Sequence, residues 1–375
     1  MFRVPRLKYI FAIWLLLAYV ACCTYLILFS KSSTYLSKSD FRAYYLGSYM
    51  LREGRIQDVY DTASQAHFYG TYADLAVPFL PFRNSPLAAL LFVPLTYLEF
   101  FTAYKVLAVI NFFILAAAFY FIYVHLKISY RALYLGLFFF GNYAALYYGQ
   151  LSPLILLISV FILLCLKYNK AFFAGLVAGL LLLKPQFFIL AILCLFITPQ
   201  KKSYLKGLMF MLVLFCMANT YMYGMGFIAD FTNFLIFSEI NNIGTAHATN
   251  FTLFSLLPST PLFYLVHGLF LLLSVLLLTS LAEKSLELAF SVAIVCTLFL
   301  NIHIQFTDLV LLIIPLLIFY STYLRTSIAR YLVVALVMFF TPILGLMLSP
   351  GLAAILGLMG CCLVVHRFAR VHPNL

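Results

Sequence analysis

Apolar runs separated by short polar segments extend along nearly the whole chain. A helix that crosses a lipid bilayer needs about 20 residues, and most of these runs approach that length. The pattern therefore predicts an all-α protein with about twelve membrane-spanning helices. Their expected positions are 9–29, 86–125, 131–148, 151–166, 171–183, 186–199, 204–225, 261–281, 286–301, 308–324, 329–347 and 351–366.

The run 86–125 is too long for one straight spanning helix. Pro86 and Pro94 each remove a backbone donor, and Glu99 adds a charge between them and the longer apolar part. We therefore expect a broken or re-entrant first part, with the run crossing the membrane once net or three times.

The composition supports a membrane protein. Hydrophobic residues make up 65% of the chain and charged residues 9%, whereas a soluble domain has about 25% charged residues. The mean hydropathy is +1.07. We expect one transmembrane domain over 1–375, a bundle without a separate soluble domain.

The net charge of +12 reflects basic residues whose placement indicates the membrane topology. In a soluble protein it would suggest a nucleic-acid partner, but here Lys and Arg lie in short loops between apolar runs, so we expect none. By the positive-inside rule we expect these loops and both termini to be cytoplasmic. The loop 30–85 holds five of the eleven acidic residues, and the loop 226–260 has no Lys or Arg. Both loops are expected to face outward.

The loop 30–85 also has a helical pattern. Tyr44, Tyr49 and Met50 recur near helical spacing, which predicts a helix lying in the membrane interface and ending at Gly54. A second interfacial helix is expected after Tyr60.

Absent motifs narrow the chemistry. All eight cysteines lie in or beside apolar runs without metal-ligand spacing. The chain contains no DxD pair, no GxxxxGK[ST] and no GxGxxG. We therefore expect no metal and no cofactor, and an activated substrate taken from the lipid.

Asp40 is the first candidate functional residue. A carboxylate at a membrane surface, with apolar surroundings that raise its pKa, can act as a general base toward a hydroxyl. The alternative is a structural role, because Ser39 and Asp40 are both good N-caps for the following helix. Arg42 and Tyr44, in the same helix, are expected to bind substrate.

Lys184 is a cation within an apolar segment, which is costly unless it serves a ligand or a partner. Pro185 predicts a break in the helix, which would turn Lys184 and Gln186 toward a cavity. The alternative is a lysine at a helix end that extends to the membrane surface.

The other candidates lie on the same expected outer side. Gln150 belongs to a tight turn, where a glutamine is usually only solvated. His303 and Asp308 are five residues apart, which favours phosphate contact or helix capping over metal binding. The remaining candidates are Arg83 and Asn84, which precede an expected helix start where an anion is favoured, and Asn250 in the second outer loop.

Several motifs, in this order, resemble glycosyltransferase family 87, which are integral membrane enzymes of the GT-C class. They are "SDFRAYYLGSYMLREGRIQDVYD", "FRNSPLAALLFVPLTYL", "YYGQLSPLILLISVFILL", "AGLVAGLLLLKPQ", "NFTLFSLL" and "HIQFTDLVLLIIPL", over about residues 36 to 320. The resemblance implies a polyprenyl-phosphate-linked sugar donor, a lipid or glycan acceptor, and inversion without metal at the outer face.

The resemblance also implies that Asp40 matches the family's essential aspartate and accepts the proton of the acceptor hydroxyl. From the membrane side on which they are expected and from their chemistry, we expect Lys184, His303 and Arg83 to hold the phosphate. Gln150 and Asp308 are expected to shape the sugar pocket. Mannose is the family's best-known sugar, but "RNSP" replaces the usual aromatic and proline entry, so the sugar stays open.

Two alternatives remain. A transporter or flippase of a lipid-linked sugar would show paired hydropathy halves, and this chain instead places its polar residues at one face. An oligosaccharide ligase or polymerase would use a lipid diphosphate donor, and the loop 226–260 has no arginine to bind one.

Overall fold

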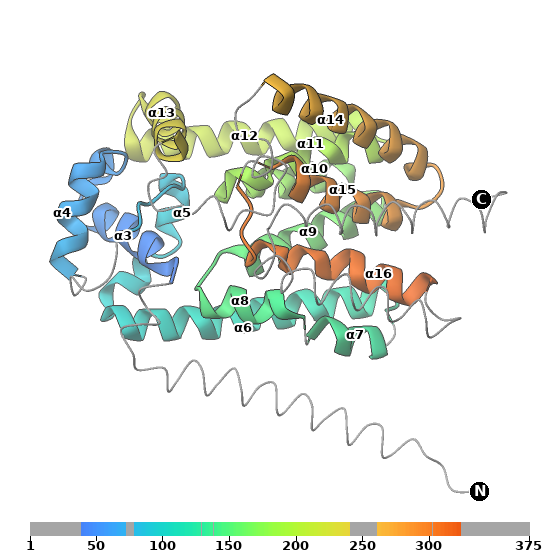
Figure 1. The fold of residues 1–375 in the computed structure, drawn as a ribbon, viewed down its shortest axis with the longest axis horizontal. Coiled ribbons are helices and arrows are strands. Elements are labelled where there is room, and N and C mark those ends of the chain that lie inside the picture. Colours follow the sequence, from blue (N-terminus) through green and yellow to red (C-terminus); the bar gives the residue numbers. More distant parts are fainter. Residues whose placement is uncertain are drawn as a thin grey trace, which may run out of the picture.

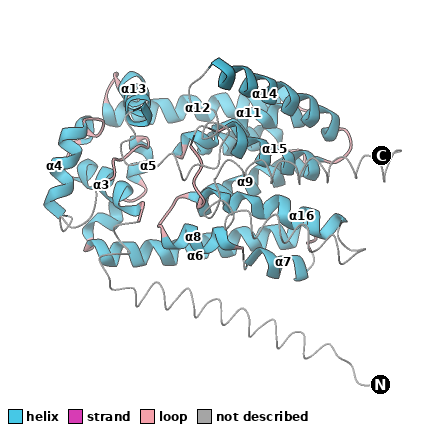
Figure 2. Ribbon diagram, in the orientation of Figure 1, coloured by secondary structure: helices cyan, strands magenta, loops and turns pink. Residues whose placement is uncertain are grey.

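The computed structural model describes residues 39–72, 79–128, 130–137, 139–240, 261–301 and 303–323. Over these residues the chain forms helices joined by turns and loops, and no strand (Figures 1 and 2). The all-α prediction is confirmed for this part of the chain. The expected spans 9–29, 329–347 and 351–366 lie outside the described residues, as does Asn250.

The segment expected to form the first outer loop contains the predicted helices, α3 (Phe41–Arg52), η1 (Ile56–Asp58) and α4 (Thr62–Tyr72). Helix α3 ends as expected, because Gly54 has a φ of +70° and donates its N–H to the Leu51 carbonyl at 3.1 Å. Nine of the twelve residues of α3 are buried, and the helix packs on α4, α5 and η2. Protein covers the faces of α3 that the sequence assigned to a membrane interface.

The run 86–125 is broken, as its prolines predict. It forms α5 (Pro86–Leu90), η2 (Val93–Tyr97) and the long α6 (Phe100–Leu126). Ser85 caps α5, since its hydroxyl accepts the Ala88 N–H at 3.3 Å. Through α5 and η2, the chain that follows the segment 30–85 packs against α3.

The expected single helix at 131–148 is wrong, because the chain forms α7 (Tyr130–Leu137) and α8 (Phe140–Tyr147). The Asn142 side chain donates to the carbonyls of Gly136 at 2.8 Å and Leu137 at 3.1 Å. Those bonds satisfy carbonyls that a continuous helix would have used. A side chain at Gly141 would meet the backbone of Val310, so α8 also approaches η7 closely.

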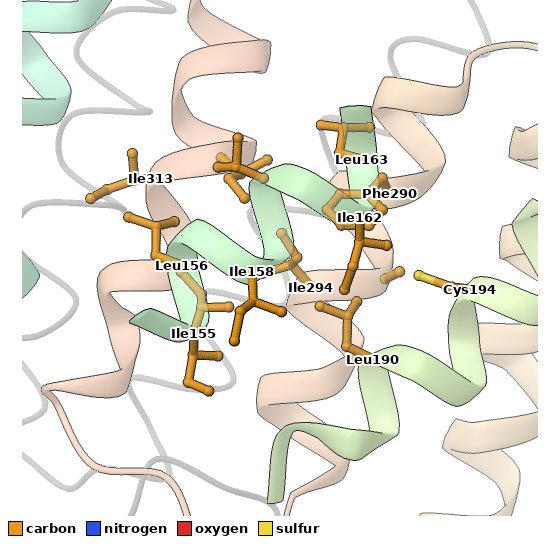
Figure 3. Close-up of a cluster of buried hydrophobic side chains, with 14 of the residues drawn as sticks. Ile155, Leu156, Ile158, Ile162, Leu163, Leu190, Cys194, Phe290, Ile294 and Ile313 are labelled. Carbon is orange, nitrogen blue, oxygen red and sulfur yellow. The ribbon is translucent and has the colours of Figure 1, made fainter. Parts of the chain in front are cut away.

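The central bundle surrounds α9 (Ser152–Lys167). Figure 3 shows Ile155, Ile158 and Ile162 of this helix packed near Leu190 and Phe290. The helices that follow α9 are α10 (Ala171–Gly179), η3 (Leu180–Leu183), η4 (Pro185–Phe187), α11 (Phe188–Ile197), α12 (Lys201–Tyr223), α13 (Phe227–Ile240), α14 (Pro261–Ala282), α15 (Leu286–Leu300), η7 (Asp308–Leu312) and α16 (Ile313–Tyr323). The run 171–199 is thus divided by 3₁₀ segments on both sides of Lys184.

Helices α10 and α12 approach each other at two glycines. A Cβ at Gly175 would overlap the carbonyl oxygen of Tyr204, and one at Gly207 would overlap that of Phe172. The absence of side chains at these two positions is what permits the backbones to lie this close.

Three helices of the described part are long and apolar enough to cross a membrane: Phe100–Leu126, Lys201–Tyr223 and Tyr264–Ala282. Other apolar helices there have only 10 to 17 residues. The total of about twelve stays a prediction. The loop expected at 226–260 begins with α13, whose Phe227 and Phe231 rings stack and whose Phe231 contacts Tyr60 of the first loop.

Candidate active site

The candidate site lies where the ends of several helices meet. The start of α3, the turn between α8 and α9, the break between η3 and η4, and the start of η7 each supply a polar side chain. The connection from α15 to α16, drawn in orange and red, runs through the middle of the view in Figure 1. Segments far apart in the sequence therefore form one polar cluster.

Asp40 begins α3, but its side chain does not cap the helix. That role belongs to Ser39, whose hydroxyl accepts the N–H of Phe41 at 3.2 Å. The Asp40 backbone N–H donates to the Tyr148 carbonyl at 2.9 Å, which ties the start of α3 to the end of α8. The Asp40 carboxylate instead accepts a hydrogen bond from Gln150 Nε2 through Oδ2.

Gln150 is almost fully buried, at 6% exposure, and so is not a solvated turn residue. Its Oε1 accepts hydrogen bonds from the Tyr44 hydroxyl at 3.0 Å and from Lys184 Nζ at 3.1 Å. Its backbone carbonyl accepts from Asn111 Nδ2 at 3.0 Å. These contacts hold both the side chain and the turn that carries it.

Lys184 is also buried, at 4% exposure, so it does not extend to a membrane surface. It lies at the predicted break, with a φ of −135° and a ψ of 87° between η3 and η4. Its ammonium forms a buried ion pair with Oδ1 of Asp308, which is 1% exposed. The same ammonium donates to the Ser152 hydroxyl at 3.1 Å, and Ser152 donates to Asp308 Oδ1 at 2.6 Å.

The surroundings of Asp40 raise the pKa of its carboxyl from 3.8 to about 6. Burial is the largest cause, because it disfavours the charged form. The hydrogen bond from Gln150 and the positive charges of Lys184 and Arg42 lower the pKa, and Asp308 raises it. The result is a carboxyl that loses its proton near neutral pH, as a general base requires.

A family model decides what kind of protein carries this cluster. The model of glycosyltransferase family 87 matches residues 82–300, more than half of the 375-residue chain. The chain belongs to glycosyltransferase family 87. The resemblance seen in the motifs is thereby confirmed, and the protein is a glycosyltransferase. No curated protein and no solved structure matches the chain.

The match places the cluster only partly within the family model. Gln150 and Lys184 of this family 87 protein lie inside the matched range, whereas Asp40 precedes it and Asp308 follows it. The contacts from Asp40 to Gln150 and from Asp308 to Lys184 connect both carboxylates to the matched part.

The other predicted site residues lie at varying positions around the cluster. Arg42 is buried in α3 beside Tyr69, and its charge acts on Asp40. Asn84 lies beside the Tyr44 hydroxyl. Its backbone carbonyl accepts a hydrogen bond from the Tyr60 hydroxyl at 3.0 Å.

Three further predicted residues lie before α5, in η4 and before η7. Arg83 is partly buried next to Asn84, and His303 is partly buried in the connection before η7. The Gln186 carbonyl accepts from Asn301 Nδ2 at 2.6 Å, which joins η4 to the end of α15.

Ser152 and Asn111 contact the cluster but were not among the residues predicted from the sequence. Asn111 had a detectable signal, because it is an amide within the apolar run of α6, where an unpaired polar group is costly. For Ser152 the sequence signal was only its position close to Gln150, at the start of α9.

The described residues contain no group of three or more His, Cys, Asp or Glu that could hold a metal ion.

Proposed function

We propose that the protein transfers a hexose from a polyprenyl-phosphate-sugar donor to a hydroxyl of a lipid or glycan acceptor. The reaction inverts the anomeric carbon, needs no metal, and takes place at the outer face of the plasma (bacterial inner) membrane, with both termini cytoplasmic. Family membership supports glycosyl transfer. The observation that carries the mechanism is the partly buried Asp40 carboxylate, held by Gln150 and with a pKa raised to about 6.

In the proposed step, an acceptor hydroxyl oxygen attacks the anomeric carbon and forms the new glycosidic bond. The bond from that carbon to the phosphate oxygen breaks, and its electron pair leaves with the polyprenyl phosphate. Asp40 takes the proton of the hydroxyl as the oxygen attacks. A base with a pKa near 6 is ionised at neutral pH and can still hold a proton afterwards.

Charge on the leaving phosphate needs positive groups near the donor. Arg42 supports this role best, because it is buried in α3 and its charge reaches Asp40. Arg83 and His303 are proposed as further phosphate ligands on sequence grounds. Tyr44 and Asn84, which lie beside each other and close to Gln150, are proposed to line the sugar site. Mannose is the first sugar to test.

The test is transfer of a labelled hexose by the purified protein in lipid nanodiscs. Polyprenyl monophosphate mannose and glucose are compared with a polyprenyl diphosphate sugar as donors. We expect transfer from a monophosphate donor, in the presence of chelator, and its loss in Asp40→Asn. Glu53→Gln is the matched control, because Glu53 is an exposed acid in the same loop that pairs only with Arg52 at the surface.

Transfer that persists in a folded Asp40→Asn variant would contradict the role of this base. Transfer from the diphosphate donor alone would instead favour a ligase or polymerase.

A further inference from the structure

We propose that Gln150 is a positioning residue, held in one orientation by Tyr44 and by the Lys184–Asp308 pair so that it presents its amide N–H to Asp40. The inference deepens the proposed function and rests on Asp40 as the base. It assigns Lys184 to this support and not to the donor phosphate.

The orientation of the Gln150 amide follows from its hydrogen bonds. A glutamine side chain has an oxygen with two acceptor positions and an NH₂ group that only donates. The Tyr44 hydroxyl and Lys184 Nζ both donate to Oε1, at 3.0 and 3.1 Å. A flipped amide would place NH₂ against the Lys184 ammonium, which cannot accept a hydrogen bond, and Oε1 against the Asp40 carboxylate, which cannot donate one when ionised. The observed orientation therefore leaves Nε2 to donate to Asp40.

Lys184 has no hydrogen-bond donor to spare in this arrangement. An ammonium group has three N–H donors. They go to Gln150 Oε1, Ser152 Oγ and Asp308 Oδ1. The charge of Lys184 is balanced by Asp308 at the same time. A phosphate would have to displace at least one of these buried partners.

Three hydrogen-bond donors hold the carboxylate of Asp308. Lys184 and Ser152 donate to its Oδ1, and the backbone N–H of Gln305 donates to Oδ2 at 3.2 Å. Gln305 belongs to the connection between α15 and η7, so this loop supports the lysine. The chain of contacts from Asp308 through Lys184 and Gln150 ends at the carboxylate of Asp40.

The consequence for Asp40 is that one oxygen of its carboxylate, Oδ2, is held by the Gln150 N–H. The Gln150 N–H engages Oδ2 and stabilises the charged form, which lowers the pKa against the effect of burial. The charged or titratable groups that act on Asp40, or on which Asp40 acts, are Arg42, Tyr44, Tyr148, Lys184 and Asp308.

Gln150→Met tests the positioning role, since it keeps the length of the side chain and removes the amide. We expect kcat to fall by about tenfold or more, with the donor KM within about twofold of the parent. The acid limb of the pH profile should move to higher pH, because the bond that favours the carboxylate is lost. Tyr44→Phe should change kcat and the pH profile in the same directions by a smaller factor.

The double variant Lys184→Met/Asp308→Leu tests the assignment of the lysine. It removes both buried charges together, so no single charge is left unpaired. We expect a several-fold lower kcat and a donor KM within about twofold of the parent. A donor KM raised by about tenfold or more would overturn the support role and make Lys184 a phosphate ligand.

Asp40→Asn, measured beside these variants, separates the two proposals. An active Asp40→Asn contradicts the base itself. An inactive Asp40→Asn, together with an unchanged kcat and pH profile in folded Gln150→Met, contradicts only the positioning role. A lower unfolding temperature with unchanged kcat per folded molecule would mean that Gln150 is merely structural, and would also overturn it.

Discussion

Gln150 donates its side-chain N–H to the carboxylate of Asp40, although 110 residues separate them in the sequence. The contact joins the start of α3 to the turn between α8 and α9, and the Tyr148 carbonyl makes the same connection through the backbone. The candidate base is therefore held by the central bundle as well as by its own helix. This attachment explains how Asp40, which precedes the matched range 82–300, keeps a defined place against the family 87 part of the chain.

The pH dependence of transfer follows from the pKa of Asp40. Burial raises this pKa to about 6, so the base is protonated and inactive in more acidic solution. We expect kcat/KM to rise with pH along a single-proton curve with its midpoint near 6. The measurement is initial rate against pH at low donor concentration. A rate that is flat from about pH 5 to 8 would contradict Asp40 as the titrating base.

Ser39→Ala separates helix capping from catalysis. The Ser39 hydroxyl and the Tyr148 carbonyl both accept the N–H of Phe41, so loss of the hydroxyl should lower stability by at most about 1 kcal/mol. The kcat of the folded variant should stay close to that of the parent. Asp40→Asn should abolish transfer and leave stability nearly unchanged, because the Asp40 side chain does not cap the helix. Thermal unfolding and transfer rates, measured on both variants, check this pair of outcomes.

Removing one partner of the buried Lys184–Asp308 pair should destabilise the protein far more than removing one partner of a pair near the surface. Lys184→Met leaves Asp308 as a buried unpaired charge, which costs about 3 to 5 kcal/mol. Adding Asp308→Leu should recover a large part of this loss. The comparison is Lys167→Met, which breaks a partly exposed pair with Glu287 and should cost about 0 to 1 kcal/mol.

These effects are read from thermal unfolding in the same nanodiscs. Equal destabilisation by Lys184→Met and Lys167→Met would be inconsistent with the buried pair.

The close approach of α10 and α12 predicts a strong effect of two small substitutions. Gly175→Ala and Gly207→Ala each place a Cβ against a backbone carbonyl of the facing helix, and such overpacking costs about 1 to 3 kcal/mol. Gly268→Ala in α14 is the matched control, because a Cβ there meets nothing within 4 Å. Thermal unfolding should show lower stability for Gly175→Ala and Gly207→Ala and no loss of stability for Gly268→Ala.

The sequence by itself determined the class of fold and the family. Apolar runs report helices because each helix satisfies its own backbone hydrogen bonds, and the prolines at 86, 94 and 185 mark breaks because proline cannot donate one. The start of α3 near Ser39 and its end at Gly54 are equally local. The sequence did not reveal that α7 and α8 are separate, since the Asn142 amide that divides them looked like one polar residue in an apolar run.

Only the tertiary structure decided which polar groups meet. Lys184 was detectable as a costly charge, but its partner Asp308 lies 124 residues away and is brought to it by the packing of η7 against α9. The same holds for Asp40, for which local sequence alone favoured a helix cap over a base. Ser39 supplies the cap, and Gln150 holds the carboxylate of Asp40, because helix packing sets these contacts while local sequence sets only the helix ends.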